Sequence, residues 1–231
     1  MKKGLILVMM VCFMLTGVVA MAAEAVPSDK STTMSFSERF KKLSEESKNP
    51  GASAQKLANM PKVAVLYVNN AKTSYDDEID QLLLGNLAKS ISSDKYQYID
   101  GAPYLERLSK IGIVDLTTAE RADIVAAFSG DDVDYVVFME LEPFIRKDKM
   151  TFFTIGKEMT ATLPLKVIDL LNNRYLYNGK FVEKATDSSM MGGIGNKSVS
   201  NKALMKINEQ VASVLAVRLP AEKPVLVPIK K

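Results

Sequence analysis

The stretch Val133-Asp134-Tyr135-Val136-Val137-Phe138-Met139 is the most strand-like part of the chain. Its β-branched and aromatic residues suit a buried, pleated strand, and we expect it to be a central strand of a sheet. A second apolar run, Val63-Ala64-Val65-Leu66-Tyr67-Val68, follows Pro61 and predicts a strand buried on both faces. The folded domain should therefore begin near residue 61.

Helical patterns fill most of the interval between these two strands. Residues 75–91 predict a helix, because acidic residues crowd its first turn and complement the helix dipole. A short strand is expected over 96–99, and Pro103 then marks the start of a second helix. Thr117-Thr118-Ala119-Glu120 has the spacing of a capping box and predicts a third helix. The expected inward residues of this third helix are Ala122, Val125 and Phe128.

Period-two alternation replaces helical spacing later in the chain. Residues 159–170 predict a half-buried strand, in which Pro164 indicates a broken or edge ladder. Leu171–Arg174 suits a hairpin turn into a return strand over 175–183. Within that strand, Asn178-Gly179 is expected to form a bulge or a second turn.

Two further segments complete the expected domain. Phe144–Lys149 is interpreted as the loop of another hairpin. A last helix is expected to begin at Ser198 or Ser200 and to end before Pro220. Helices first and antiparallel strands later predict an α+β fold, with helices packed on a mixed sheet.

The first residues have the three-part layout of a signal peptide. Lys2 and Lys3 precede the uncharged stretch 4–23, and small residues follow with A-x-A-like cleavage sites. We expect cleavage near residue 25 and an extracytoplasmic protein, periplasmic or secreted. The alternative is an uncleaved membrane anchor, for which about 20 apolar residues suffice. Cys12 lies inside the apolar run, so we expect no lipid attachment there.

Four segments follow from this pass along the chain. They are a signal peptide over 1–25, a polar arm with a short amphipathic helix over 26–60, a single α/β domain over 61–220, and a proline-containing tail over 221–231.

Composition limits the chemistry that the mature protein can perform. The chain has no histidine, and its single cysteine lies within the expected signal peptide. Removal of that segment would exclude imidazole and thiol catalysis, disulfides and the usual zinc sites. No concentrated basic patch suggests binding to nucleic acid. We therefore expect no catalytic residue, no cofactor and no metal.

A glycine-rich loop is the first candidate contact site. Its residues are Gly192, Gly193, Gly195, Asn196 and Lys197. The Walker pattern requires adjacent Gly and Lys, whereas Asn196 separates them here. We interpret the segment as a flexible loop that enters a helix and is a candidate for partner contact.

A short helix in the polar arm is the second candidate. Ser35–Glu38 has the spacing of a capping box, and Phe36, Phe40 and Leu43 recur at i, i+4 and i+7. Such a stripe either docks on the domain or binds a partner from a tether.

Three acidic residues near the central strand, Asp131, Asp132 and Asp134, resemble hard-cation ligands. The further ligands and glycine of a calcium loop are missing, so helix-end polarity explains them better.

Glu140 and Glu142 have the i, i+2 spacing of paired carboxylates and are the basis of an alternative function. Two such groups about 5 to 9.5 Å apart can hydrolyse glycosides. The chain has no Trp for a sugar platform, and we expect Tyr175 and Tyr177 to pack on the sheet instead.

Three short motifs carry a family resemblance. They are Lys62–Asn69, Val133–Val137 and Leu165–Leu170, the last followed by Asn172-Asn173-Arg174-Tyr175-Leu176. Over roughly residues 60–220 the chain resembles the extracytoplasmic α/β domain shared by the TolB N-terminal domain, LpoB and CsgG. This resemblance implies a non-enzymatic binding or assembly module of the cell envelope. LpoB and CsgG are lipoproteins, and this chain departs from them in lacking a credible lipid-attachment cysteine.

The leading hypothesis is therefore an exported, non-catalytic module that recognises an envelope protein. The alternative is a carboxylate-dependent hydrolase acting on cell-wall glycan or peptide, and the CsgG resemblance adds a structural subunit as a third possibility. Contact with a membrane is expected only through an uncleaved signal anchor.

Overall fold

A computed structural model describes residues 38, 40, 42, 58–114, 118–150, 155–189 and 195–227. All of them belong to the unit Met34–Lys231. The element order is β1 (Lys62–Asn69), α3 (Asp76–Ser90), β2 (Gln97–Asp100), α4 (Ala102–Lys110), α5 (Arg121–Ala127), β3 (Tyr135–Leu141), β4 (Ile145–Met150), β5 (Ile155–Asp169), β6 (Arg174–Ser189) and α6 (Asn196–Arg218).

These strands form one mixed sheet in the order β2-β1-β3-β5-β4, with β6 on the other edge of β5. β1 runs parallel to β2 and β3, whereas β5 is antiparallel to β3, β4 and β6. β3 and β4 pair with successive parts of β5, so they lie along the same edge of it. The α+β fold with a mixed sheet is confirmed.

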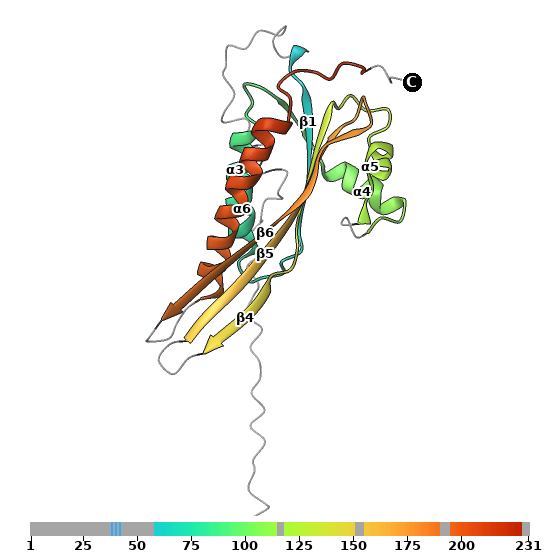
Figure 1. Ribbon diagram of the computed structural model, residues 1–231. Helices are drawn as coiled ribbons and strands as arrows, with labels where there is room; N and C mark the ends of the chain where they lie inside the picture. Colours follow the sequence, from blue (N-terminus) through green and yellow to red (C-terminus); the bar gives the residue numbers. More distant parts are fainter. Residues whose placement is uncertain are drawn as a thin grey trace, which may run out of the picture. The chain divides into compact units, whose positions relative to one another are not determined.

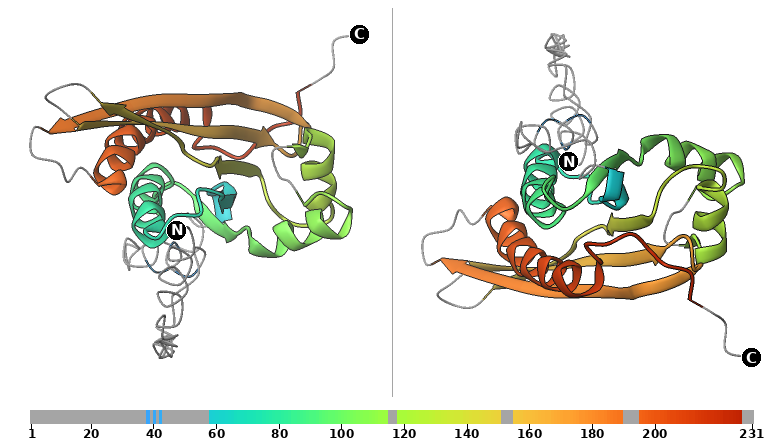
Figure 2. Two further views of the ribbon diagram at one scale, coloured as in Figure 1. Left: turned by 90° about the horizontal axis from the view of Figure 1, so that it is seen from below. Right: turned by 90° about the horizontal axis from the view of Figure 1, so that it is seen from above.

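Helices cover both faces of the sheet. α3 and α6 lie side by side on one face, and α4 and α5 lie on the other (Figures 1 and 2). Alternate residues of β1 serve the two sides: Val63 and Val65 belong to the core under α3 and α6, and Ala64 and Leu66 to the core under α4 and α5. The prediction that β1 is buried on both faces is therefore confirmed.

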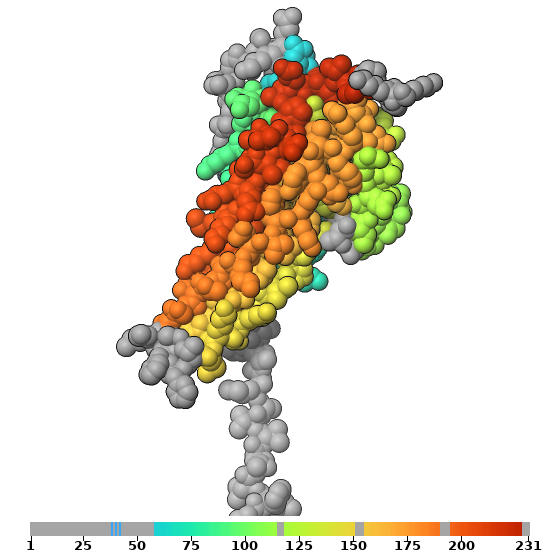
Figure 3. Space-filling view, viewed as in Figure 1, coloured from blue at the N-terminus to red at the C-terminus, as the bar shows by residue number. Residues whose placement is uncertain are grey.

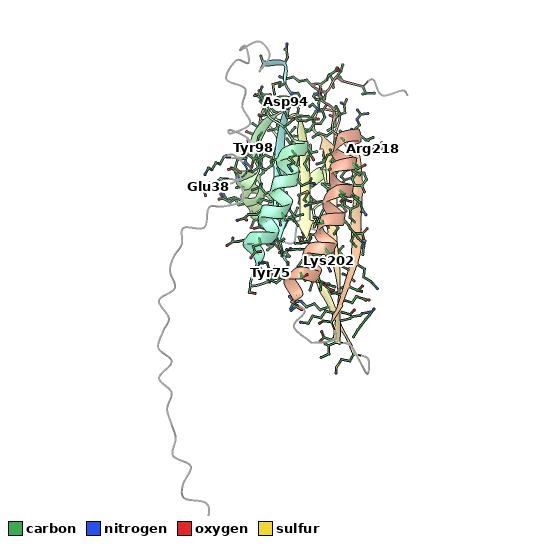
Figure 4. The ribbon with its side chains drawn as sticks, turned by 90° about the vertical axis from the view of Figure 1, so that its left-hand side faces the viewer. Glu38, Tyr75, Asp94, Tyr98, Lys202 and Arg218 are labelled. Atoms are coloured by element: carbon green, nitrogen blue, oxygen red, sulfur yellow. The ribbon has the colours of Figure 1, made fainter. Side chains whose placement is uncertain are left out.

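Polar contacts join α3 to α6. The Asn86 side chain donates to the Asn208 carbonyl over 2.7 Å, and the Asn208 side chain donates to the Leu82 carbonyl over 3.1 Å. Near the start of both helices, the Ser200 and Tyr75 hydroxyls are 3.2 Å apart. Figure 4 labels Tyr75 at the start of α3 and Lys202 on α6. These bonds set the relative position of the two helices on the sheet.

The segment Phe144–Lys149 was wrongly predicted as a loop, because Ile145–Met150 is strand β4. All six of its residues are exposed, so no apolar alternation marks it in the sequence. Its backbone pairs with Ile155–Thr160 of β5, and that ladder makes it a strand.

The third helix begins later than its expected capping box. Glu120 is the N-cap of α5, and its box partner is Asp123, whose carboxylate accepts the Glu120 amide over 2.9 Å. This start changes which side faces inward: Ile124 and Ala127 are buried, whereas Ala122 is exposed. Phe128 is buried as predicted.

The last helix and the β6 bulge also differ from expectation. α6 begins at Asn196 with Gly195 as N-cap, and Ser200 is buried inside it. β6 continues through Asn178-Gly179, and the register shift lies opposite Val167/Ile168. A Cβ at Gly179 would come within 2.7 Å of the Tyr177 hydroxyl, so glycine leaves room for that side chain.

Pro164 lies in β5 between the part that pairs with β4 and the part that pairs with β3. The β3 pairs end at Leu165 and the β4 pairs begin at Thr160. The interruption predicted at Pro164 is present, but β5 is an internal strand rather than an edge.

Candidate functional site: a cleft beside α5

A cleft of about 540 Å³ lies where α5, the loop before β3 and the β5–β6 turn meet. Figure 1 shows α5 close to the end of the sheet at which β5 and β6 are joined. The lining residues are Ala122, Val125, Ala126, Phe128 to Asp134, Leu170, Leu171 and Asn173. Two walls come from the continuous stretch 122–134 and the third from residues 170–173, about 40 residues later, so the cleft exists only in the folded chain.

The floor of the cleft is apolar. Val125, Val133 and Leu170 are partly buried against the core under α4 and α5, and Phe128 belongs to that core. The Phe128 ring stacks on the Tyr104 ring with centroids 3.7 Å apart. The Arg107 guanidinium lies over the Tyr104 ring, 5.0 Å from its centroid. These contacts hold the floor in place while one side of it faces the cleft.

The rim is acidic. Asp131 forms an ion pair with Arg107, and Asp132 forms one with the Lys62 ammonium. The Asp134 carboxylate accepts the Lys62 backbone amide over 2.8 Å. The Lys62 bond also holds the pKa of Asp132 below its usual range. Three carboxylates face two cations here, which leaves the rim with a net negative charge.

These three aspartates do not gather into a metal site. Each of them is engaged by a cation or an amide of the chain, and the described residues contain no group of acidic side chains that could hold a metal. Asp131 and Asp132 lie in the loop between α5 and β3, and Asp134 directly precedes β3.

A buried carboxylate fixes the turn that forms the third wall. Asp169 is 1% exposed and accepts the Asn172 amide, the Asn172 side chain and the Arg174 guanidinium over 3.1, 2.8 and 3.1 Å. Asn173 adopts a left-handed backbone with φ of 45°, which Asn tolerates better than most residues. The turn is therefore held by side chains as well as by the strand ladder.

The segment after α6 is bound to the same turn. The Asn172 side chain donates to the Val225 carbonyl over 3.1 Å and accepts the Val227 amide over 2.9 Å. The Tyr135 hydroxyl donates to the Glu222 carbonyl over 2.9 Å. Burial, together with Asp169 and Asp134, raises the pKa of Tyr135 to about 12.

The glycine-rich loop lies elsewhere. Gly192 and Gly193 fall outside the described residues, and Gly195 caps α6. The Lys157 ammonium donates a hydrogen bond of 3.1 Å to the side-chain oxygen of Asn196, and Lys197 forms an ion pair with Glu78. Lys157 lies near the start of β5 and Leu170 directly after its end, so the described part of this loop is remote from the cleft. Its role in partner contact remains a prediction.

Only one residue of the arm stripe is described. Phe36 and Leu43 lie outside the described residues, whereas Phe40 is fully buried and its ring centroid is 4.3 Å from that of Tyr98. Figure 4 shows Glu38 and Tyr98 on the same side of the domain. This contact favours docking for Phe40, and the partner role of the stripe stays a prediction.

The two carboxylates of the hydrolase alternative have unequal surroundings. Glu140 is 2% exposed and accepts the Asn70 side chain over 2.7 Å. Glu142 lies beyond the end of β3, and its amide donates to the Thr162 carbonyl. Neither residue lines the cleft.

Tyr175 and Tyr177 pack as expected. Tyr175 lies against the core under α4 and α5, where Arg121 is 5.7 Å from its ring centroid. Tyr177 lies against the other core and stacks with Phe181.

Sequence reasoning missed most of the cleft. The Asn172-Asn173 turn was visible as a turn signal, and the three aspartates as an acidic group. Nothing in the sequence places Leu170 and Leu171 beside α5, because that contact depends on the pairing of β3 with β5.

No helix among the described residues is long and apolar enough to cross a membrane. No protein-family model matches the sequence, and no curated protein matches it.

Several solved structures are similar to this chain. The hypothetical protein CT253 from Chlamydia trachomatis is 13% identical with a TM-score of 0.42, over 68% of this chain and 98% of that chain. The LpoB C-terminal domain from Salmonella enterica is 12% identical with a TM-score of 0.30, over 62% and 93%. TolB from Acinetobacter baumannii is 13% identical with a TM-score of 0.32, over 71% and 29%. LpoB and TolB both belong to the resemblance found in the sequence, but likenesses this weak carry no functional argument.

Proposed function

We propose that this chain is an exported, non-catalytic binding or assembly module of the cell envelope, and that it recognises a protein partner through the cleft beside α5. The observation that carries the proposal is the cleft itself, in which an apolar floor meets a rim of three aspartates. Export rests on the N-terminal sequence, with its basic start, apolar run and small residues.

The chemistry of the cleft selects a class of partner segment. A volume of about 540 Å³ lies in the range of ligand-binding pockets and can hold a few side chains. Apolar side chains would lie on Phe128, Val133 and Leu170, and a neighbouring Lys or Arg would meet the acidic rim. The expected ligand is therefore a protein segment in which an apolar residue stands beside a basic one.

A binding role fits these residues better than catalysis. The rim carboxylates already have partners within the chain, two of them in ion pairs and one with a backbone amide. Histidine is absent from the sequence, and the only cysteine precedes the proposed cleavage site. The cleft offers groups that hold a ligand, and we assign it no reaction.

Site-specific photo-crosslinking in intact cells tests this function. A photoreactive residue at Ala126, which is exposed and lines the cleft, should give a discrete adduct with one envelope protein. The matched control is Ala216, which is exposed on α6. Adducts of equal intensity from both positions, or none from Ala126, would contradict the proposal.

A blocking variant gives a second readout. Ala126→Arg places a long cationic side chain in the cleft, and Arg is a good helix former, so α5 should persist. We expect this variant to lose the partner in a pull-down from envelope extract, while Ala216→Arg retains it. The intact mass of the purified protein reports in the same experiment whether residues 1–25 were removed.

A further inference from the structure

The sheet extends beyond the helices of one face. The core under α4 and α5 draws its fully buried strand residues from β1, β3 and the end of β5, and Ile99 and Tyr175 pack against it from β2 and β6; none of the described residues of β4 or of the first half of β5 belongs to it. All six residues of β4 are exposed. Figure 3 shows β4 and β6 running to the lower end of the molecule, away from α5. We call residues 145–150 and 155–160 the hairpin end.

Charge is segregated toward this end. Residues 145–150, 155–160, 180–189 and 196–206 contain nine Lys or Arg against four Asp or Glu. The other described residues contain 12 basic and 18 acidic side chains, so the remainder of the domain is negative. The near-neutral total charge of the chain conceals this separation.

Three of the four acidic residues in these segments, Glu158, Glu183 and Asp187, form ion pairs within the chain, whereas no ion pair among the described residues involves Asp148. Glu158 lies between Lys149 and Lys184, at 2.5 and 3.1 Å, and these bonds hold its pKa below the usual range. Asp187 pairs with Lys202 over 2.7 Å. Among the described residues, no ion pair involves Arg146 or Lys147, so their charge is available to a partner.

An exposed apolar pair closes the hairpin ladder. Met150 pairs directly with Ile155. Met150 is 79% exposed and Ile155 is 49% exposed. The β4–β5 register places Lys147 and Lys149 on one face of the sheet and Arg146 and Lys157 on the other. Cations on both faces thus surround an apolar end.

We propose that the hairpin end binds the surface of an anionic phospholipid bilayer, end on. Apolar residues surrounded by Lys and Arg suit the headgroup region, where the apolar side chains reach the acyl boundary and the cations stay among the phosphates. Binding to an acidic protein partner would require cations on only one face of the hairpin end. Cations on both faces, together with the exposed Met150 and Ile155, favour a bilayer. This contact is separate from the cleft and from any signal anchor.

Vesicle co-sedimentation of the purified full chain tests the proposal. The vesicles are phosphatidylcholine alone, or phosphatidylcholine with phosphatidylglycerol in a three-to-one ratio. We expect binding to the anionic vesicles only, and we expect it to weaken as salt is raised, because salt screens the attraction. An uncleaved apolar anchor would bind both kinds of vesicle, so the difference between them isolates the hairpin end.

A double neutralisation identifies the residues. Arg146→Gln with Lys147→Gln removes two exposed charges, each worth about fivefold in membrane affinity, so we expect about 30-fold weaker binding. Lys89→Gln with Lys95→Gln, at exposed positions outside the hairpin end, is the matched control and should bind like wild type. Met150→Ser should weaken binding and leave its salt dependence unchanged.

Several results would overturn the proposal. They are equal binding of wild type to both vesicles, no binding to the anionic vesicles at low salt, or equal affinity of the two double variants. A lysine-rich edge strand also discourages pairing with other chains, and that role alone predicts no preference for anionic lipid. The salt dependence of wild type is a readout that does not require the variants to fold.

Discussion

Asp169 is the buried charge on which the cleft wall depends. It is 1% exposed, and three donors from the β5–β6 turn converge on it. Arg174 lies half exposed at the edge of this group, so solvent weakens its attraction, whereas the two Asn172 bonds are shielded. The turn and one wall of the cleft are therefore held by a single carboxylate.

Asp169→Ala should lower the free energy of unfolding by about 2–4 kcal/mol, because it leaves the buried donors of the turn without an acceptor. The exposed Glu209→Ala on α6 is the matched control and should change stability by less than about 0.5 kcal/mol. Urea unfolding monitored by circular dichroism measures both. Equal stability of the two variants would show that the turn does not need Asp169.

Tyr135 should make the stability of the protein sensitive to high pH. Burial raises its pKa to about 12, from about 10 in an unfolded chain. Folding therefore favours the protonated phenol: its contribution is complete below about pH 10 and is lost as pH rises through about 12. Burial also raises the pKa values of Tyr67, Tyr96, Tyr104 and Tyr175, so the same loss is shared among several side chains.

The Tyr135→Phe variant tests this dependence. Its free energy of unfolding at neutral pH should be lower by about 1 kcal/mol, because the hydrogen bond to the Glu222 carbonyl is lost. Its stability should then fall less steeply than that of wild type between pH 10 and 12, because one titrating group is gone. Parallel curves for the two proteins in urea unfolding would refute the assignment.

Two glycines show how individual elements tolerate a side chain. Gly85 lies inside α3 and Gly130 in the loop after α5, and an added Cβ would meet no atom within 4 Å at either position. Only Gly130 has a left-handed backbone, with φ of 87°. The two sites therefore differ in backbone conformation and not in available space.

Opposite effects are expected from the same substitution at these sites. Gly85→Ala should stabilise the protein by about 0.5–1 kcal/mol, since alanine is the better helix former. Gly130→Ala should destabilise it by about 1 kcal/mol, because the left-handed conformation is strained for any residue with a Cβ. Thermal unfolding compares the variants, and a change of the same sign in both would argue against this account.

Element predictions succeeded where a segment carries its own burial pattern. β1, β3, α3 and α4 were recognised in the sequence, because apolar runs, acidic first turns and Pro103 are local signals. β4 was missed because its exposed, charged residues hide the strand, and only its pairing with β5 defines it. The start of α5 was misplaced because the box that caps it, Glu120 with Asp123, lies three residues beyond the box expected at Thr117–Glu120 and lacks the Ser or Thr of that pattern.

At the scale of the whole molecule, the cleft and the hairpin end lie at opposite ends of β5. β5 spans about 45 Å from Ile155 to Asp169, and about 30 Å of it lies between Thr160 and the cleft wall. The cleft end is acidic and the hairpin end is basic, so an anionic surface would orient the domain with its cleft facing away. A membrane-bound molecule would then hold its partner site toward the surrounding compartment.

The two ends should act independently. Ala126→Arg should leave vesicle binding unchanged, and the Arg146→Gln, Lys147→Gln variant should retain the photo-adduct at Ala126. Sites this far apart with no shared contacts normally have additive effects. A variant at one end that abolishes binding at both ends would show coupling, or a loss of the fold that circular dichroism would detect.

The sequence by itself determined the fold class, the central strand and the chemistry that is missing. These depend on local patterns and on composition: apolar runs, helix starts and the absence of histidine. Only the tertiary structure decided that Val133–Met139 serves two cores, that β4 is a strand, and that Asp131, Leu171 and α5 share a cleft. Strand pairing and charge separation join residues far apart in the chain, and no local pattern encodes which of them will meet.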